Sequence, residues 1–166
     1  MKKYFSIMFL ALLAIFAVSC EDDRNDDFAD NDTYPLMRDI TGSFNSGNSY
    51  TITQGIDISS SDVVLVYRDI NSGNSNGSVW QLLPKTEFLT NSRELDYNFL
   101  FDSQNIEIYT EANFDQATLS STESSTYLNN QRFRIVLVPA AQVKNANLNY
   151  SDYDSVIKYF NLRDRP

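Results

Sequence analysis

Two neighbouring runs of alternating residues constrain the fold most. In residues 95–102 (LDYNFLFD), large apolar side chains occupy every second position, namely Leu95, Tyr97, Phe99 and Phe101. Residues 105–112 (NIEIYTEA) alternate in the same way. Because successive side chains of a β-strand point to opposite faces, both runs are typical of strands with one buried face. The polar residues between them favour a turn, so we expect an antiparallel hairpin.

Two other runs, 62–70 and 132–140, have apolar residues at consecutive positions, which is typical of central strands that are covered on both faces. Weaker strand patterns cover residues 40–45, 50–57, 78–83 and 86–90. The resulting seven or eight short strands predict a mainly β fold, an antiparallel β-sandwich over residues 40–166.

Residues 151–161 interrupt the strand pattern. Their apolar side chains recur at helical spacing, namely at Tyr153, Val156, Ile157 and Phe160. This spacing predicts a short C-terminal helix with one face packed on the sandwich, and we expect Ser151 and Asp154 to cap its start. A second short helix or turn is expected at 140–143. Residues 115–130 are rich in Ser, Thr and Asn, so a long loop or irregular crossover is expected there.

The N-terminal residues 1–20 follow a different pattern, in which Lys2 and Lys3 precede an uncharged, mostly apolar stretch at 4–18. This order is typical of a secretory signal peptide. The stretch is shorter than the roughly 20 apolar residues that a transmembrane helix needs. We therefore expect residues 1–19 to be a signal peptide.

Cys20 is the only cysteine, and it follows small residues at positions 17 and 19. The segment AVSC resembles a bacterial lipobox, with Ala17 in place of the usual leucine. The resemblance implies that the Cys20 thiol receives a diacylglycerol, that cleavage precedes Cys20, and that acyl chains such as palmitate anchor the protein. The alternative is ordinary cleavage after Ala17 or Ser19, which would leave a free thiol. A lone thiol is a liability in an oxidising compartment, and two or three acyl chains anchor stably, so lipidation is favoured.

The residues from 20 to 39 carry strong negative charge, because seven acids stand against Arg24 between positions 21 and 32. Such a segment buries too little apolar surface to order itself, so we expect a disordered linker. Glu21, Asp22 and Asp23 resemble the surface-export signal of Bacteroidota lipoproteins, which implies display on the outer leaflet of the outer membrane. Its periplasmic face is the alternative. EF-hand spacing is missing from the sequence, so no calcium site is expected.

Composition excludes several kinds of chemistry. The chain has no histidine and one cysteine, which excludes a Ser-His-Asp triad, a His-ligated zinc and a Cys₄ cluster. The glycines form no dinucleotide fingerprint. A net charge of −9 argues against nucleic-acid binding. We therefore predict no catalytic residue, no cofactor and no metal site.

Two polar segments superficially suggest sites. The segment 69–77 holds residues common in metal and phosphate loops, namely Asp69, Asn71, Gly73 and Gly77. It lacks the lysine of a phosphate loop, so a hairpin loop is expected. Glu107 and Glu111 lie on one predicted strand, roughly 13 Å apart by strand rise, whereas glycosidase carboxyl pairs need about 5–9.5 Å. We interpret these two residues as solvent-face acids.

Aromatic residues are abundant, with 11 Phe, 10 Tyr and the single Trp80. Most occupy inward-facing positions, so core packing is expected. The alternative is an exposed row of rings that stacks on sugars or binds peptide. Its members would be Tyr50, Tyr67, Trp80, Tyr109 and Tyr127.

Nearly the whole chain resembles a family of small Bacteroidota lipoproteins of uncharacterised function. The motifs that carry the resemblance are, in order, SCEDD, SDVVLVYRD, SVWQLLP, LDYNFLF, FRIVLVPA and DYDSVIKYF. Some relatives are automatically named dihydrolipoamide dehydrogenase, but this chain lacks the dinucleotide fingerprint, redox cysteine pair and histidine base of that enzyme. We expect a membrane-anchored, non-catalytic lipoprotein with a binding or assembly domain. A glycan- or peptide-binding module and a carboxylate-based hydrolase are the alternatives.

Overall fold

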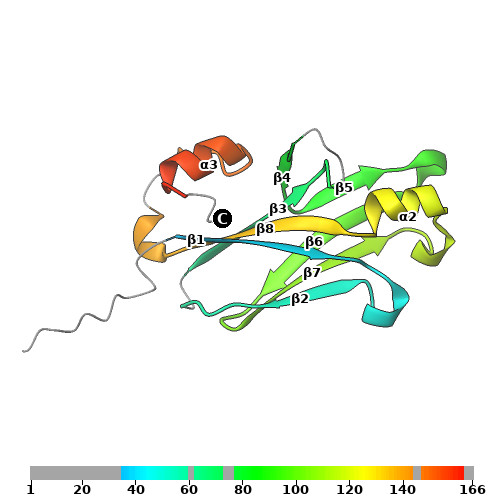
Figure 1. Cartoon of the computed structure of the whole chain (residues 1–166), viewed down its shortest axis with the longest axis horizontal. Helices are drawn as coiled ribbons and strands as arrows, with labels where there is room; N and C mark the ends of the chain where they lie inside the picture. The colour runs from blue at the N-terminus through cyan, green and yellow to red at the C-terminus, as the bar shows by residue number, and fades with distance from the viewer. Residues whose placement is uncertain (1–34, 60–61, 73–76, 144–146, 163–166) are drawn as a thin grey trace, which may run out of the picture. The chain divides into compact units, whose positions relative to one another are not determined.

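The computed structural model describes residues 35–59, 62–72, 77–143 and 147–162, which contain eight strands in two antiparallel sheets (Figure 1). Sheet A contains, in spatial order, β1 (Leu36–Gly42), β8 (Gln131–Val138), β3 (Val63–Asp69) and β4 (Trp80–Leu82). Sheet B contains, in spatial order, β2 (Thr51–Gly55), β7 (Asn105–Ala112), β6 (Glu94–Phe101) and β5 (Lys85–Phe88). The predicted antiparallel sandwich is confirmed. The predicted signal peptide, Cys20 and the acids that follow it lie outside the described residues.

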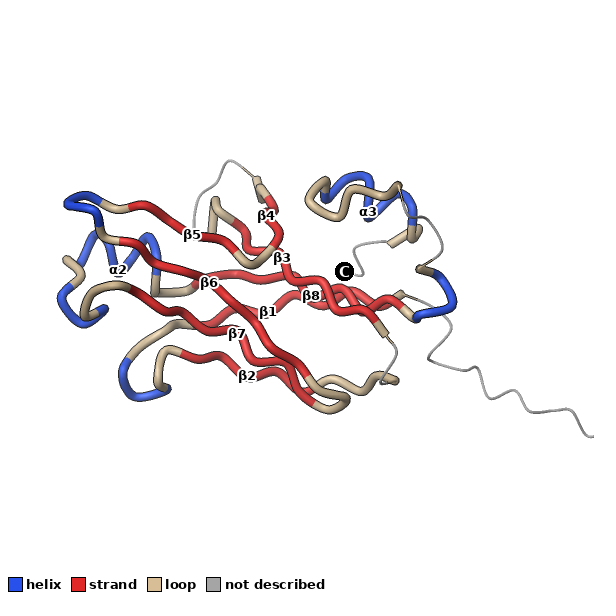
Figure 2. Tube along the Cα trace, turned by 180° about the vertical axis from the view of Figure 1, so that it is seen from behind, coloured by secondary structure: helices blue, strands red, loops and turns tan. Residues whose placement is uncertain are grey.

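The central strands of sheet A, β3 and β8, are covered on both faces, which explains their consecutive apolar residues. One face packs against sheet B through Val64, Val66, Phe133 and Ile135. The other face packs against the short C-terminal helix α3 (Tyr153–Tyr159) through Leu65, Tyr67, Val136 and Val138. The predicted helix is therefore confirmed, and Figure 2 shows it on the side of sheet A, away from β2.

β6 and β7 form the predicted hairpin, in which Phe99 pairs with Ile108. In the connecting turn, the Asp102 carboxylate accepts hydrogen bonds from the N–H groups of Gln104 and Asn105, each at 2.7 Å. These hydrogen bonds favour the charged carboxylate and hold the pKa of Asp102 below its usual value. The turn is therefore fixed by the residue types that predicted it.

The core between the sheets centres on aromatic rings. The Phe133 ring centre lies 5.9 Å from that of Phe44 and 6.5 Å from that of Tyr97. At one end of the core, a Cβ atom on Gly42 would lie 2.6 Å from Cδ1 of Ile52. Glycine therefore lets β1 and β2, which belong to opposite sheets, approach closely at this point.

A buried arginine connects the two sheets. Arg68 of β3 is 4% exposed, and its Nη1 donates to Oε1 of Glu87 on β5 at 2.9 Å. Its Nε and Nη2 donate to Oε1 of Gln131 at 2.9 and 2.8 Å. The guanidinium also lies 4.2 Å from the centre of the Tyr97 ring. One cation thus contacts a carboxylate, an amide and an aromatic face.

The long loop expected at 115–130 is wrong, although the segment does cross over from β7 of sheet B to β8 of sheet A. This segment contains a 3₁₀ helix, η3 (Gln116–Thr118), and an α-helix, α2 (Ser121–Tyr127). Ser120 caps α2, and Glu123 completes a capping box by accepting a hydrogen bond from the Ser120 N–H at 2.9 Å. The pattern Ser-x-x-Glu is the sequence signature of that motif, and it outweighs the low helix propensity of Ser and Thr here.

Two boundaries also differ from prediction. α3 is capped by Asp152, whose side chain accepts hydrogen bonds from Ser155, rather than by Ser151 and Asp154. β1 begins at Leu36, so residues 36–39 of the predicted linker belong to a strand. The reason is that the pairing of β1 with β8 extends to Leu36, which lies opposite Leu137. The 3₁₀ helix η4 (Ala140–Gln142) confirms the turn expected at 140–143.

Candidate functional site

A pocket of about 510 Å³ lies between β4, β8 and the start of α3. Three buried or half-buried residues line its inner part, namely Trp80, Arg134 and Tyr153. Exposed residues line its rim, namely Ser78, Val79, Ser151, Asp152 and Asp154. We call this set of residues the Trp80 pocket. Its volume falls within the range of about 300–1,000 Å³ that is typical of small-molecule sites.

The β3–β4 hairpin positions Trp80. In the strand register Trp80 lies opposite Asp69, and β4 is an edge strand of sheet A. The Asp69 carboxylate accepts hydrogen bonds from the N–H groups of Asn71 and Val79 at 3.1 and 3.0 Å. The predicted interpretation of segment 69–77 as a hairpin loop is therefore confirmed for its described residues. Asp69 fixes both ends of this loop.

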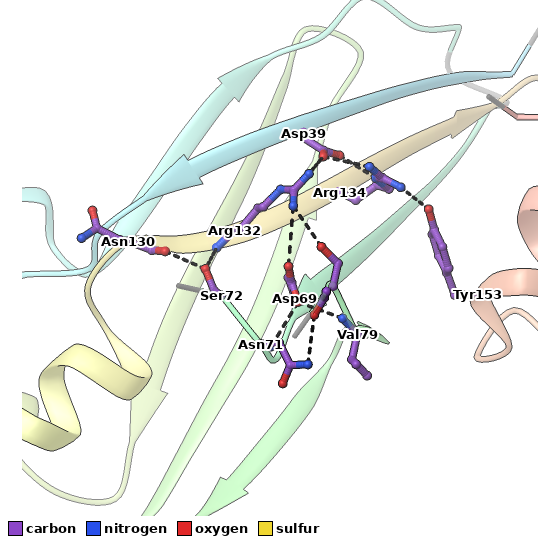
Figure 3. Close-up of polar contacts among 11 residues, drawn as sticks. Asp39, Asp69, Asn71, Ser72, Val79, Asn130, Arg132, Arg134 and Tyr153 are labelled. Carbon is purple, nitrogen blue, oxygen red and sulfur yellow. Dashed lines mark hydrogen bonds and ion pairs between the residues drawn. The ribbon is translucent and has the colours of Figure 1, made fainter. Parts of the chain in front are cut away.

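An arginine pair on β8 lies beside Trp80, and Arg134 of this pair lines the pocket. Arg132 and Arg134 are two residues apart on one strand, so they share the outer face of sheet A. Asp39 of β1 lies opposite Arg134 in the register and accepts hydrogen bonds from its Nε and Nη2 at 2.6 and 2.9 Å (Figure 3). Arg132 Nη2 donates to the same carboxylate at 2.5 Å. Asp39 thus fixes both guanidinium groups.

The two arginines also fix the aromatic rings of the pocket. The Arg134 guanidinium lies 4.4 Å from the centre of the Trp80 ring, and that of Arg132 lies 5.1 Å from it. Arg134 Nη1 donates a hydrogen bond to the Tyr153 hydroxyl (Figure 3). The Trp80 and Tyr153 ring centres are 5.7 Å apart, and the rings are tilted by 36°. Cation–π and hydrogen-bond contacts therefore hold both rings in a fixed arrangement.

Both signs of charge line the Trp80 pocket. The two arginines are balanced by Asp39 and by Asp69, whose Oδ2 lies 3.7 Å from Arg132 Nη1. Asp152 and Asp154 add two carboxyl groups at the rim. Hydrogen bonds from the Ser155 side chain and backbone hold the pKa of Asp152 below its usual value, so this group is ionised at neutral pH.

Acid is expected to weaken the domain through Asp39. Burial raises the pKa of Asp39, but its hydrogen bonds and charge interactions with Arg134 and Arg132 outweigh burial and hold the pKa below 3.8. A carboxyl group with a lowered folded-state pKa stabilises the fold above its unfolded pKa, and this contribution is lost as the pH falls through the folded value. At pH values under about 4, the free energy of unfolding of the wild type should therefore decrease more steeply with falling pH than that of Asp39→Asn.

Chemical denaturation between pH 2 and pH 7 measures this difference. Asp57→Asn is the matched control, because it neutralises an exposed carboxyl group of the same domain. Parallel stability curves for wild type and Asp39→Asn would show that the arginine pair does not hold Asp39 in the folded state.

The expected core packing is confirmed for three of the five aromatic residues of the alternative exposed row, namely Tyr50, Tyr67 and Tyr127. Tyr50 and Tyr127 pack against the core between the sheets, and Tyr67 is fully buried beneath α3. Tyr109 lies on the outer face of sheet B, because its neighbours along β7 point inward. Only Trp80 of the five lines the pocket. The row fails because these residues belong to strands and loops that face in different directions.

Sequence reasoning missed the arginine pair, Asp39 and the role of Tyr153 in the pocket. The available signal was the spacing of Arg132 and Arg134, which interrupts one face of an otherwise apolar strand pattern. The predicted solvent-face acids Glu107 and Glu111 do lie on one face of β7, on the outer side of sheet B, and they do not line the pocket.

Among the described residues, no group of three or more Asp, Glu, Cys or His side chains could hold a metal ion. None of their helices is long and apolar enough to cross a membrane. Comparison of the chain with protein-family models, curated proteins and solved structures found no match.

Proposed function

We propose that this chain is a lipid-anchored, non-catalytic outer-membrane lipoprotein whose sandwich domain binds a ligand at the cell surface. The observation that carries the binding role is the Trp80 pocket, which combines two fixed aromatic rings with charged and hydroxyl side chains. Small-molecule sites typically combine an apolar or aromatic wall with a few oriented polar groups in this way.

The contacts of the acidic side chains support a binding role over hydrolysis. Asp39 and Glu87 are paired with arginines, and Asp69 holds a loop. Asp152 lines the pocket but caps α3, and its pKa is lowered. A carboxylic acid that protonates a leaving group needs a raised pKa, so Asp152 is unsuited to general acid catalysis.

The anchoring part of the proposal rests on the order of features along the N-terminal sequence. A basic start, an apolar stretch, Cys20 and an acidic run follow one another. Lipid on Cys20 would hold the domain at the membrane, and residues 21–34 would separate the domain from it. Glu21, Asp22 and Asp23 would direct the anchored chain to the outer leaflet.

Cys20→Ser is expected to abolish lipid attachment. Cells that express the full chain are labelled with a clickable fatty acid, and the protein is captured and compared with an immunoblot for total amount. Wild type should carry label, whereas the variant should carry none, because serine lacks the thiol that accepts the diacylglycerol. The variant should also keep its N-terminal segment, since cleavage of lipoprotein signals follows lipidation. Equal labelling of the two proteins would refute the lipid anchor.

A further inference from the structure

We infer that the Trp80 pocket is a binding site for an uncharged carbohydrate. This inference rests on the proposed binding function and names the ligand class of the same site. Three features of the pocket lead to it: the signs of its charges, the chemistry of its lining and the fixed position of its rings.

The charges of the pocket disfavour ligands that carry a net charge. Asp152 and Asp154 at the rim repel an anion. The guanidinium groups of Arg132 and Arg134 already lie over the Trp80 ring, so a cationic ligand would have to displace them to make a cation–π contact there. An uncharged ligand meets neither obstacle.

The lining matches a ligand that is rich in hydroxyl groups. A hydroxyl donates one hydrogen bond and accepts two, so it pairs equally well with a carboxylate and with a guanidinium. The rim of the pocket offers Asp152 and Asp154 as acceptors, the hydroxyl of Ser151 as donor and acceptor, and the hydroxyl of Ser78, which accepts from Arg132 at 3.0 Å, as a donor. Trp80 is half-buried and lines the pocket, so it supplies apolar surface against which the C–H groups of a sugar can pack.

The pocket is also preorganised for such a ligand. Trp80 and Tyr153 are held by Arg134, and Arg134 is held by two hydrogen bonds to Asp39. Tyr153 additionally packs edge-on against buried Tyr67, with ring centres 5.2 Å apart. Because these side chains are already ordered, binding loses little side-chain entropy, which favours affinity for a small ligand.

The test uses the full chain, expressed with its own N-terminal segment and purified from cells in mild detergent. Affinity electrophoresis is run through gels that contain a β-glucan, a galactomannan, an arabinoxylan or an α-glucan, and through polygalacturonate as the anionic counterpart. We expect retardation by at least one neutral polysaccharide and none by polygalacturonate. Oligosaccharides of the retarding polymer should also change the intrinsic fluorescence of Trp80, which is the only tryptophan.

Two variants locate the binding. Trp80→Ala should weaken binding by about tenfold or more, because it removes the aromatic wall of the site. Asp154→Lys should also weaken it by about tenfold or more, and because Asp154 is exposed, this change leaves the core intact. Glu111→Lys is the matched control, since it makes the same charge reversal at an exposed position on sheet B. This control should bind like wild type.

Two results would overturn the inference. Retardation by none of the neutral polysaccharides would exclude the ligand class, and equal binding by wild type and both pocket variants would exclude the site. Retention by polygalacturonate alone, lost in Trp80→Ala, would refute the uncharged ligand and still support a binding role for the pocket. Fatty-acid labelling of Cys20 is read separately, so none of these results affects the anchoring proposal.

Discussion

Arg68→Met is expected to lower the free energy of unfolding by about 3–5 kcal/mol. The substitution keeps much of the side-chain volume but removes the cation between the sheets. Glu87 and Gln131 then lose the hydrogen bonds that Arg68 donates to them at 2.8–2.9 Å. Leaving one member of a largely buried ion pair without its partner costs more than the pair contributes, because Glu87 is only 25% exposed and Gln131 is fully buried, so water replaces the lost donors poorly.

Urea denaturation followed by circular dichroism measures this effect. Arg38→Met is the matched control, because Arg38 is an exposed arginine on β1 of the same sheet. The control should lie within about 0.5 kcal/mol of wild type. Adding Glu87→Leu to Arg68→Met should recover part of the loss, since no unpaired carboxylate remains. A midpoint for Arg68→Met equal to that of the control would contradict the structural role of the buried arginine.

Phe133→Ala is expected to destabilise the domain by about 3–5 kcal/mol. Phe133 is fully buried on β8 of sheet A. Its ring packs against Phe44, in the connection between β1 and β2, and against Tyr97 on β6 of sheet B. Truncation removes its transfer free energy and leaves a cavity that rigid neighbouring strands only partly fill.

Phe88→Ala is the matched control for this substitution. Phe88 is 75% exposed on β5, so the same truncation removes little buried surface. Its unfolding midpoint in urea should stay close to that of wild type, within about 0.5 kcal/mol in stability. Equal destabilisation by the two substitutions would show that the rings at Phe133 and Phe44 do not form the centre of the core.

The strands could be predicted because successive side chains of a strand point to opposite faces. When one face is buried, apolar residues therefore occupy every second position of the sequence. Residues 95–112 show it most clearly. The central position of β3 and β8 could also be predicted, since each has apolar residues on both faces. α3 followed from the spacing of Val156 and Phe160, and α2 could have been recognised from Ser120 and Glu123.

The pocket could not be predicted, because it depends on the order of strands within sheet A. Asp39 and Arg134 are 95 residues apart and meet only when β1 pairs with β8 in one register. Tyr153 reaches them only when α3 packs on the outer face of that sheet. Local patterns specify which face of a strand is buried, but many strand orders satisfy those patterns equally well.

Protease digestion of intact cells tests most directly whether the domain is displayed at the cell surface, as we propose. A periplasmic protein that stays undigested shows that the cells are intact. We expect wild type to be degraded without lysis, and the variant with Glu21, Asp22 and Asp23 replaced by alanine to be protected until the cells are lysed. The matched control replaces Asp26, Asp27 and Asp30, which removes the same charge farther from Cys20, and should be degraded like wild type. Protection of wild type in intact cells, with degradation only after lysis, would contradict the proposed display of this domain on the cell surface.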